Sequence, residues 1–205
     1  MIQCRHLELI SFTVITIMSA VALTREEILT RIVATFRQHG YEGASLALLS
    51  EATGLGRSSL YHHFPNGKED MAKAALEWVL QCFDELVLAP LRATQQTPLK
   101  RLQACAKGLA AFYDDGARSC LLNIFSIGSA GKLFQDELAL RTQGLIQIYT
   151  DIAKESGISA REAKRRGENA LIGIQGALVI SRTIGSKEPF LRLIKEFPEQ
   201  MLWPE

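Results

Sequence analysis

The chain has 205 residues, of which 47% are hydrophobic and 22% are charged. These proportions are typical of a folded globular protein and exclude an intrinsically disordered chain. The formal net charge is only +1, so binding to nucleic acid would have to come from local geometry, because the chain has no overall basic field that attracts phosphates.

The first segment, residues 1–23, contains an uncharged run from Leu9 to Leu23. This run is shorter than the ~20 apolar residues that a membrane-spanning helix needs. Three interpretations stay open: an N-terminal extension that precedes a natural start at Met18, a helix that packs on a partner, and a targeting segment with weak signal-peptide features. We favour the extension and expect no membrane association.

A capping box predicts the start of the first helix. Thr24 can accept the amide proton of Glu27, while the Glu27 side chain reaches back to Thr24. Gly40 supplies a left-handed stop, so we expect a helix over 25–39. Its apolar face has helical spacing and consists of Ile28, Ile32, Val33 and Phe36.

Two short helices follow, over 46–52 and 57–63, with Ser45 as the cap of the first. They are separated by Thr53-Gly54-Leu55-Gly56. Gly54 permits the backbone angle of a tight turn, so this arrangement predicts a helix-turn-helix. The second helix of such a motif can lie in the major groove of DNA.

The rest of the chain also has helical periodicity. A long helix is expected from Lys68 to about residue 88, and Thr97-Pro98 caps the next one. Further helices are expected at about 119–129, 132–155, 159–184 and from 188 onward. The sequence therefore predicts an all-α fold of about nine helices.

The stretch Leu60-Tyr-His-His-Phe-Pro-Asn-Gly-Lys-Glu69 resembles the signature of the TetR family of bacterial repressors. The resemblance covers about residues 25–78, and Ser50 departs from it because members usually have Ala in this helix. It implies a helix-turn-helix DNA-binding domain over 24–70 and a helical ligand-binding and dimerisation domain over 71–205. The boundary then falls inside the fourth helix.

The resemblance and the helix geometry together indicate the DNA contacts. Arg57 is expected to pair with a guanine, or alternatively to contact a phosphate or remain solvated. Tyr61, His62 and Lys68 are expected at the DNA backbone, with a half-buried packing role for Tyr61 and a solvated Lys68 as the alternatives. The helix N-terminus at Ser45 suits a phosphate. No carboxylate or cysteine at ligand spacing accompanies the adjacent histidines 62 and 63, so we expect no metal there. The full predicted set is Ser45, Arg57, Ser58, Ser59, Tyr61, His62 and Lys68.

Two further sites are implied for the C-terminal domain. Small residues at three- and four-residue spacing let another helix approach closely; the expected homodimer interface is Gly173, Ala177, Ile180, Ser181, Phe190 and Ile194. Internal packing of these residues is the alternative. A mostly apolar cavity for a neutral or hydrophobic effector is also implied, although a core or surface role remains open for each candidate: Phe112, Asn123, Phe125, Gln143, Gln147, Tyr149 and Gln175.

The four cysteines, Cys4, Cys82, Cys105 and Cys120, form no CxxC pair and lack zinc-ligand spacing. We expect buried thiols at Cys82 and Cys105, whereas a redox-sensitive Cys120 stays open. No cofactor is expected, and reduced thiols suit the cytoplasm.

These features favour one function over two others. We expect a cytoplasmic, homodimeric repressor that binds a palindromic double-stranded operator and releases it when a small-molecule effector binds. A DNA-binding protein without an inducer, architectural or tethered to a membrane, is the alternative, and a cavity too small for a ligand would favour it. An enzyme is not expected, because no catalytic set occurs at credible spacing and all four histidines lie in the first third of the chain.

Overall fold

The computed structural model describes residues 23–203, which form ten α-helices and no β-strand. The all-α fold class is confirmed. The interpretations placed on residues 1–22, including the start at Met18, lie outside the described residues. No helix within residues 23–203 combines the length and the hydropathy that crossing a membrane requires.

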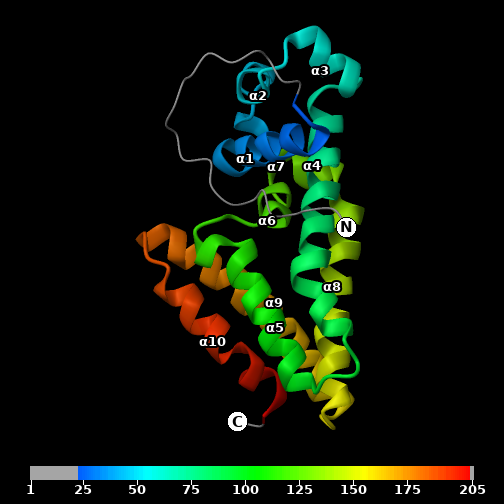
Figure 1. Cartoon of the computed structure of the whole chain (residues 1–205), viewed down its shortest axis with the longest axis vertical. Helices are drawn as coiled ribbons and strands as arrows, with labels where there is room; N and C mark the ends of the chain where they lie inside the picture. The colour runs from blue at the N-terminus through cyan, green and yellow to red at the C-terminus, as the bar shows by residue number, and fades with distance from the viewer. Residues whose placement is uncertain (1–22, 204–205) are drawn as a thin grey trace.

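The N-terminal helices form a small unit at one end of the molecule (Figure 1). They are α1 (Arg25–Gly43), α2 (Leu46–Thr53) and α3 (Arg57–His63). The expected capping box is present, since the Thr24 side chain accepts from the Glu27 amide and the Glu27 carboxylate accepts from the Thr24 amide at 2.8 Å. Helix α1 is longer than predicted because the chain resumes helical geometry after a kink at Gly40, where φ is 68°.

Helix α4 (Lys68–Phe83) connects this unit to the rest of the chain (Figure 1). It continues into a π-helical turn over Asp84–Leu88 and a 3₁₀ turn over Ala89–Arg92, where the sequence predicted one uninterrupted helix to about residue 88. Met71, Ala72, Ala75 and Leu76 of α4 are fully buried and anchor the helix; α4 packs against α1.

The C-terminal helices are α5 (Pro98–Phe112), α6 (Leu121–Phe125), α7 (Gly128–Leu133), α8 (Gln135–Glu155), α9 (Ala160–Ile184) and α10 (Glu188–Leu202). Thr97 caps α5, with Pro98 in its first turn, as predicted. The helix expected over 119–129 is interrupted before Gly128, whose φ of 65° is left-handed. This break raises the number of helices to ten.

Helices α5, α8, α9 and α10 pack into a bundle (Figure 1). Helices α8 and α9 approach closely, because a Cβ added at Gly167 would lie 2.7 Å from the carbonyl oxygen of Ile146. Arg101 of α5 is 5% exposed, and its Nε donates to the Leu91 carbonyl at 2.7 Å while its guanidinium pairs with Glu155 of α8. The bundle is thus fixed by close backbone packing and by largely buried cations, of which Arg101 is one.

An aromatic cluster, which consists of Phe36, Tyr41, Phe125 and Phe134, joins α1 to α6 and α7. The Phe36 and Phe125 rings meet edge to face with centroids 5.3 Å apart, and Phe125 stacks on Phe134 at 5.5 Å. Such aromatic pairs add ~0.5–1.5 kcal/mol beyond their buried area. The N-terminal unit is therefore packed on the C-terminal helices as well as linked to them by α4, and the domain boundary inside α4 stays a prediction.

Candidate nucleic-acid interface and effector cavity

The turn between α2 and α3 has the geometry that a helix-turn-helix needs. Gly54 is the C-cap of α2 with φ 68° and ψ 8°, a left-handed conformation that glycine adopts without steric cost. Leu49 of α2 and Leu60 of α3 are buried at 0% and 1% exposure, so they clamp the two helices together. The prediction that Gly54 forms a bend is confirmed.

Side-chain hydrogen bonds stabilise this turn. The Thr53 hydroxyl donates to the Leu49 carbonyl at 2.7 Å, and the Ser50 hydroxyl donates to the Leu55 carbonyl at 2.6 Å. Ser50 is the position at which the sequence departs from the family pattern. Its hydroxyl satisfies a carbonyl in the turn, which gives a physical reason for serine at this position.

The outer face of α3 is available to a groove. Arg57, Ser58, Ser59, Tyr61 and His62 are all exposed, and the Tyr61 side chain keeps 43% of its surface accessible. The opposite face, which includes Leu60, is buried in the unit. Five of the seven predicted DNA-contacting residues thus share one exposed surface.

The other two predicted residues flank this surface. Ser45 is exposed and caps α2, since its hydroxyl oxygen accepts the Leu48 amide proton at 3.2 Å. Lys68 is partly buried, and its Nζ donates to the Tyr41 carbonyl at 2.9 Å and lies 4.5 Å from the centroid of the Tyr41 ring. Lys68 therefore ties the start of α4 to the end of α1 and has two remaining ammonium protons for other acceptors.

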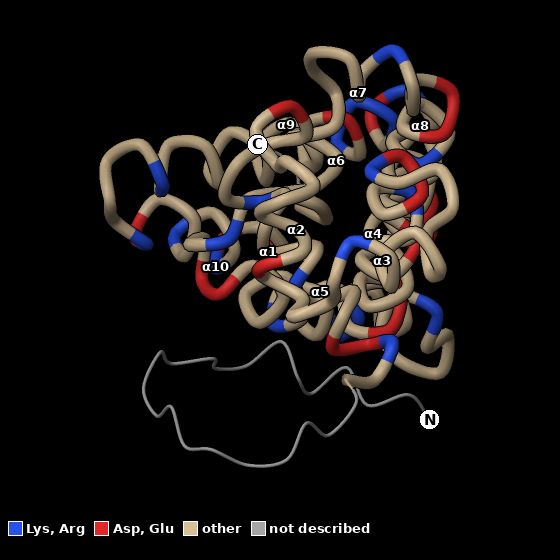
Figure 2. Tube along the Cα trace, turned by 90° about the horizontal axis from the view of Figure 1, so that it is seen from above, with Lys and Arg blue, Asp and Glu red and all other residues tan. Residues whose placement is uncertain are grey.

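Figure 2 looks onto this end of the molecule and shows basic and acidic positions interspersed along the trace. No single basic face stands out in that view, in agreement with the net charge of +1. Recognition at this surface would rest on a few placed groups, chiefly Arg57, and on the shape of α3.

Three of the predicted effector residues, Phe112, Tyr149 and Gln175, line one apolar cavity beside α4. Its volume is about 20 Å³, which is room for about one water molecule. Its wall also includes Tyr113, which the apolar pattern of the sequence had placed there. The remaining wall residues were not predicted from the sequence: Val79, Leu80, Phe83, Leu109, Cys120, Leu121, Leu122, Leu145, Leu171 and Ile174.

The other four predicted effector residues lie elsewhere. Phe125 is buried in the aromatic cluster with α1, because α6 turns it toward the N-terminal unit. Asn123, Gln143 and Gln147 are exposed, and the Gln147 amide donates to Asp151 at 2.7 Å. None of these four side chains lines the cavity. The prediction was wrong for them because helical periodicity alone does not tell against which neighbour each face of a helix packs.

The polar groups around the cavity are kept neutral by burial. Desolvation raises the pKa of the Tyr113 and Tyr149 phenols well above their ordinary value. Burial also raises the pKa of the Cys105 thiol to about 12, although a hydrogen bond with Tyr149 opposes the shift. Cys82, Cys105 and Cys120 are all buried, reduced thiols, an environment that suits inert thiols better than a redox sensor at Cys120.

Arg37 of α1 is a further polar group beside the cavity that sequence reasoning missed. Its guanidinium lies 5.8 Å from the centroid of Phe112, a cavity-lining ring. Burial lowers its pKa, and the charge of the nearby Arg118 acts in the same direction. A signal was present in the sequence, since Arg37 follows the buried Val33 by four residues and so shares its face of α1.

The residues predicted for the dimer interface mostly pack inside the chain. Ser181, Phe190 and Ile194 are buried, and the Ser181 hydroxyl accepts the Phe190 amide proton at 3.1 Å. Gly173 faces Leu193 of α10, and Ala177 is partly buried. Burial within one chain corrects the expectation that Ser181, Phe190 and Ile194 face a second copy. For Gly173, Ala177 and the exposed Ile180 a place in a dimer interface stays a prediction.

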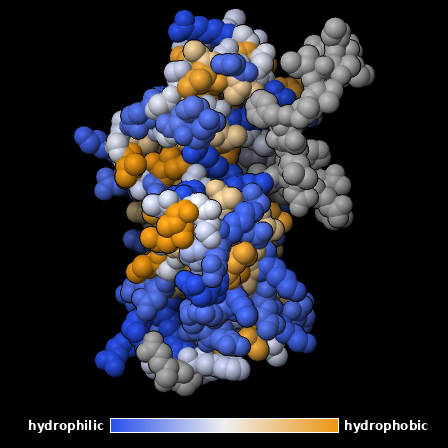
Figure 3. All heavy atoms as spheres, turned by 90° about the vertical axis from the view of Figure 1, so that its left-hand side faces the viewer, coloured by the Kyte–Doolittle hydropathy of each residue, from blue (hydrophilic) through white to orange (hydrophobic). Residues whose placement is uncertain are grey.

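An exposed apolar surface does occur on α9 and α10. Ile180 is 51% exposed and Ile172 is 67% exposed. Figure 3 views the molecule from the side on which α10 lies, and hydrophobic patches interrupt the hydrophilic surface there. We define the outer apolar face as Ile172, Val179, Ile180, Ile184 and Leu191.

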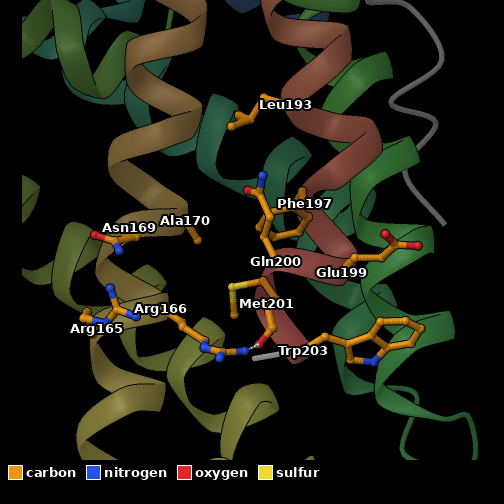
Figure 4. A pocket seen from close by; sticks show the side chains of 10 residues that line it. All are labelled: Arg165, Arg166, Asn169, Ala170, Leu193, Phe197, Glu199, Gln200, Met201 and Trp203. Atoms are coloured by element: carbon orange, nitrogen blue, oxygen red, sulfur yellow. Dashed lines mark hydrogen bonds between the residues drawn. The ribbon is translucent and has the colours of Figure 1, made fainter. Parts of the chain in front are cut away.

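Two wider grooves lie outside the cavity. One, of about 570 Å³, lies between α9 and α10, with Asn169 and Ala170 on the first helix and Phe197 and Gln200 on the second (Figure 4). The other, of about 640 Å³, lies between α4 and α8. Within residues 23–203 no group of three or more His, Cys, Asp or Glu side chains is placed to hold a metal ion.

Comparison with known proteins agrees with this geometry. Residues 28–75 match the profile of the bacterial regulatory proteins, tetR family. The HTH-type transcriptional regulator LmrA of Bacillus subtilis is 25% identical over 86% of this chain and 95% of its own length. YxaF, from the same organism and also an HTH-type transcriptional regulator, is 24% identical over 85% and 93%. The repressor AcnR of Corynebacterium efficiens is 40% identical over 25% of this chain and 32% of its own length.

Solved structures share the whole fold. A TetR transcriptional regulator from Legionella pneumophila superposes with a TM-score of 0.75 at 19% identity, covering 90% of this chain and all of that one. The TetR family regulator CifR, a cysteine mutant in complex with operator DNA, gives a TM-score of 0.71 at 21% identity over 91% of this chain and all of that one. Residues 28–75 therefore match the DNA-binding region of the tetR family of bacterial regulatory proteins, and the chain is similar over most of its length to transcriptional regulators and shares the TetR fold.

Proposed function

We propose that this protein is a cytoplasmic, homodimeric repressor that binds a palindromic operator and leaves it when a small molecule fills the apolar cavity. The left-handed turn at Gly54, which presents the outer face of α3, is the observation that carries the DNA-binding part. In this proposal the chain regulates transcription and catalyses no reaction.

Arg57 at the start of α3 is the specificity-determining residue of the proposal. Its fork of donors matches the two major-groove acceptors of guanine, a contact worth ~1–3 kcal/mol of discrimination. Ser58, Ser59 and His62 lie on the same exposed face, while Tyr61 and the free protons of Lys68 are directed to phosphates. The α2 N-terminus at Ser45 adds a further phosphate contact.

Dimerisation is proposed through the outer apolar face of α9 and α10. Two recognition helices have to reach successive major grooves ~34–36 Å apart, and exposed aliphatic side chains on neighbouring helices are suited to a second copy. Ile180→Arg should convert the dimer to monomers in sedimentation velocity runs. Leu140→Arg is the matched control, because Leu140 is 67% exposed on α8, outside this face. A monomeric wild type, or a dimer that tolerates Ile180→Arg, would contradict this interface.

The release step is proposed to run through α4. The start of this helix packs on α1, and Val79, Leu80 and Phe83 near its end line the cavity. A ligand that enlarges the cavity has to displace this wall, and α4 then changes the separation of the two α3 helices. Affinities for operator and effector must be reciprocally coupled.

Fluorescence anisotropy with labelled fragments of the promoter of its own gene tests DNA binding directly. We expect one fragment to bind tightly and to lose ~10³–10⁵ in affinity between 50 and 200 mM salt, as for ~6–10 phosphate contacts. Arg57→Ala should reduce discrimination between this fragment and scrambled DNA, while Lys107→Ala, an exposed position on α5, should not. Equal affinity for all fragments would refute the proposal.

The small cavity favours a second candidate, a DNA-binding protein of the same family without an inducer. The inducible repressor and the protein without an inducer predict different results in a thermal-shift screen of small apolar compounds, followed by measurements of operator binding. A compound that raises the Tm and weakens operator binding supports the inducible repressor. Compounds that bind without any change in operator affinity support the second candidate.

A further inference from the structure

Arg37 of α1 is a partly buried cation whose Nε lacks a hydrogen-bond acceptor. Its Nε is fully buried and has no hydrogen-bond partner among the described residues, and the Phe112 ring centroid lies 5.8 Å from its guanidinium. The groups that act on its charge are Tyr113, Arg118, Cys120 and Cys82. None of these is a carboxylate, so within residues 23–203 this guanidinium has no counter-ion.

Such an arrangement is costly to the unliganded protein. Buried polar groups in native structures are nearly always hydrogen-bonded, and exceptions call for an explanation. Arginine stays protonated at neutral pH even when burial lowers its pKa. The second cation nearby, Arg118, makes the surroundings of Arg37 more electropositive. An anion that reached this position would find the unused Nε–H donor and, among residues 23–203, no carboxylate acting on the same charge.

The position adjoins the effector cavity. Arg37 lies in a small cavity of about 10 Å³, which it shares with Trp78 and Cys82. Val79 and Phe112 line both this cavity and the apolar one. Two side chains therefore separate the guanidinium from the space that an effector is proposed to fill, and Tyr113 and Cys120 of that space are among the neighbours of Arg37.

We infer that the effector is an apolar organic acid whose hydrocarbon body opens the cavity and whose carboxylate pairs with Arg37. This inference rests on the proposed function and replaces the expectation of a neutral ligand. Because Arg37 belongs to α1, the ion pair connects the ligand to the DNA-binding unit itself, in addition to the route through α4. Carboxylate and guanidinium form the strong, charge-assisted type of hydrogen bond.

Isothermal titration calorimetry with octanoate and 4-phenylbutyrate, each against its primary amide, tests the inference. The amide keeps the body and shape of the ligand but removes its charge. We expect the wild-type protein to bind the acids about 10- to 100-fold more tightly than the amides, as for hydrogen bonds to a charged group. The chain has two tryptophans, so in a Trp203→Phe background the fluorescence of Trp78 reports independently on occupancy beside Arg37.

Arg37→Met removes the charge and keeps most of the apolar stem against Phe112. It should abolish the preference for acids, leave the affinity for amides unchanged, and melt no lower than the wild type, because a buried donor without an acceptor is gone. Lys107→Met is the control, since it changes the net charge equally at an exposed site on α5.

Equal binding of acids and amides by the wild type, no binding of either acid, or a preference that survives Arg37→Met would overturn the inference. If Arg37→Met fails to fold, the comparison of acid and amide binding by the wild-type protein still tests the inference. Operator binding is measured on the same wild-type sample, so loss of the acid preference with intact operator binding removes only this inference, whereas absent operator binding removes the proposed function.

Discussion

Substitution of Gly54 tests the geometry on which DNA recognition depends. The residue has φ 68° and ψ 8°, and a Cβ at this position would meet no atom within 4 Å. Gly54→Ala therefore introduces backbone strain without a steric clash. A left-handed alanine costs about 1–2 kcal/mol, and the smaller conformational entropy of the unfolded chain offsets about 0.4–1 kcal/mol of this.

The net destabilisation is thus about 1 kcal/mol, which lowers the Tm of a chain of this size by about 2–4 °C. Gly56→Ala is the matched control, because Gly56 has φ −62° and is equally free of neighbours. In Gly56→Ala, the lower conformational entropy of the unfolded chain stabilises the protein, and alanine as a poorer N-cap destabilises it. The two effects nearly cancel, so the free energy of unfolding should change by about zero. Gly54→Asn should fall between the two, since asparagine tolerates the left-handed region.

The assay is urea unfolding followed by circular dichroism, with operator anisotropy measured at a temperature where every variant is folded. Gly54→Ala should also weaken operator binding, because a strained turn reorients α3, whereas Gly56→Ala should not. If Gly54→Ala proves as stable as Gly56→Ala and binds DNA equally well, the left-handed turn does not position α3 and the reasoning fails.

Three further substitutions or reagents test the rest of the structure. Arg101→Ala should destabilise the fold by about 2–4 kcal/mol in urea unfolding, because it leaves the Leu91 carbonyl and Glu155 without their partner; a change near zero would contradict the buried contact. Two arginines lower the pKa of Glu162 from 4.5 to about 2, so its stabilising effect is complete above pH 4.5 and is lost as the pH falls toward 2. Glu162→Gln should remove this part of the acid dependence, and an NMR titration of the carboxyl that gave an ordinary pKa would refute it. The Cys105 thiol, with its pKa of about 12, should resist a disulfide reagent at pH 8 in the native protein and react in urea, as mapped by peptide mass analysis.

Local signals explain why the N-terminal unit was predictable. The capping box at Thr24 and the glycine at position 54 each specify one backbone conformation through their own side chain or its absence. The boundaries of α3 agree with the prediction for the same reason, since Gly56 and Phe64 end the periodic pattern on both sides. The presence of helices in the C-terminal part was also predicted, from the helical periodicity of its apolar residues.

Which face of a helix meets which neighbour was not predictable. Small residues on α9, such as Gly173 and Ser181, are equally suited to a partner copy or to α10, and only the tertiary arrangement decides between them. The break before Gly128 depends on a backbone angle that the apolar run conceals. Arg37 was missed because an arginine on the edge of an apolar stripe is ordinarily solvated.

The small volume of the apolar cavity has a consequence for the sensitivity of the proposed switch. With about 20 Å³ of free volume, the cavity as described has no room for an organic effector, so the proposed binding has to draw on a minor open population. If that population is ~1%, the observed Kd is ~100-fold weaker than the intrinsic one. Trimming the fully buried Leu109 to Ala would raise the open fraction, and the detection threshold of the sensor would then fall without any change in ligand contacts. Core packing is thereby a separate means of setting the effector concentration at which the switch responds.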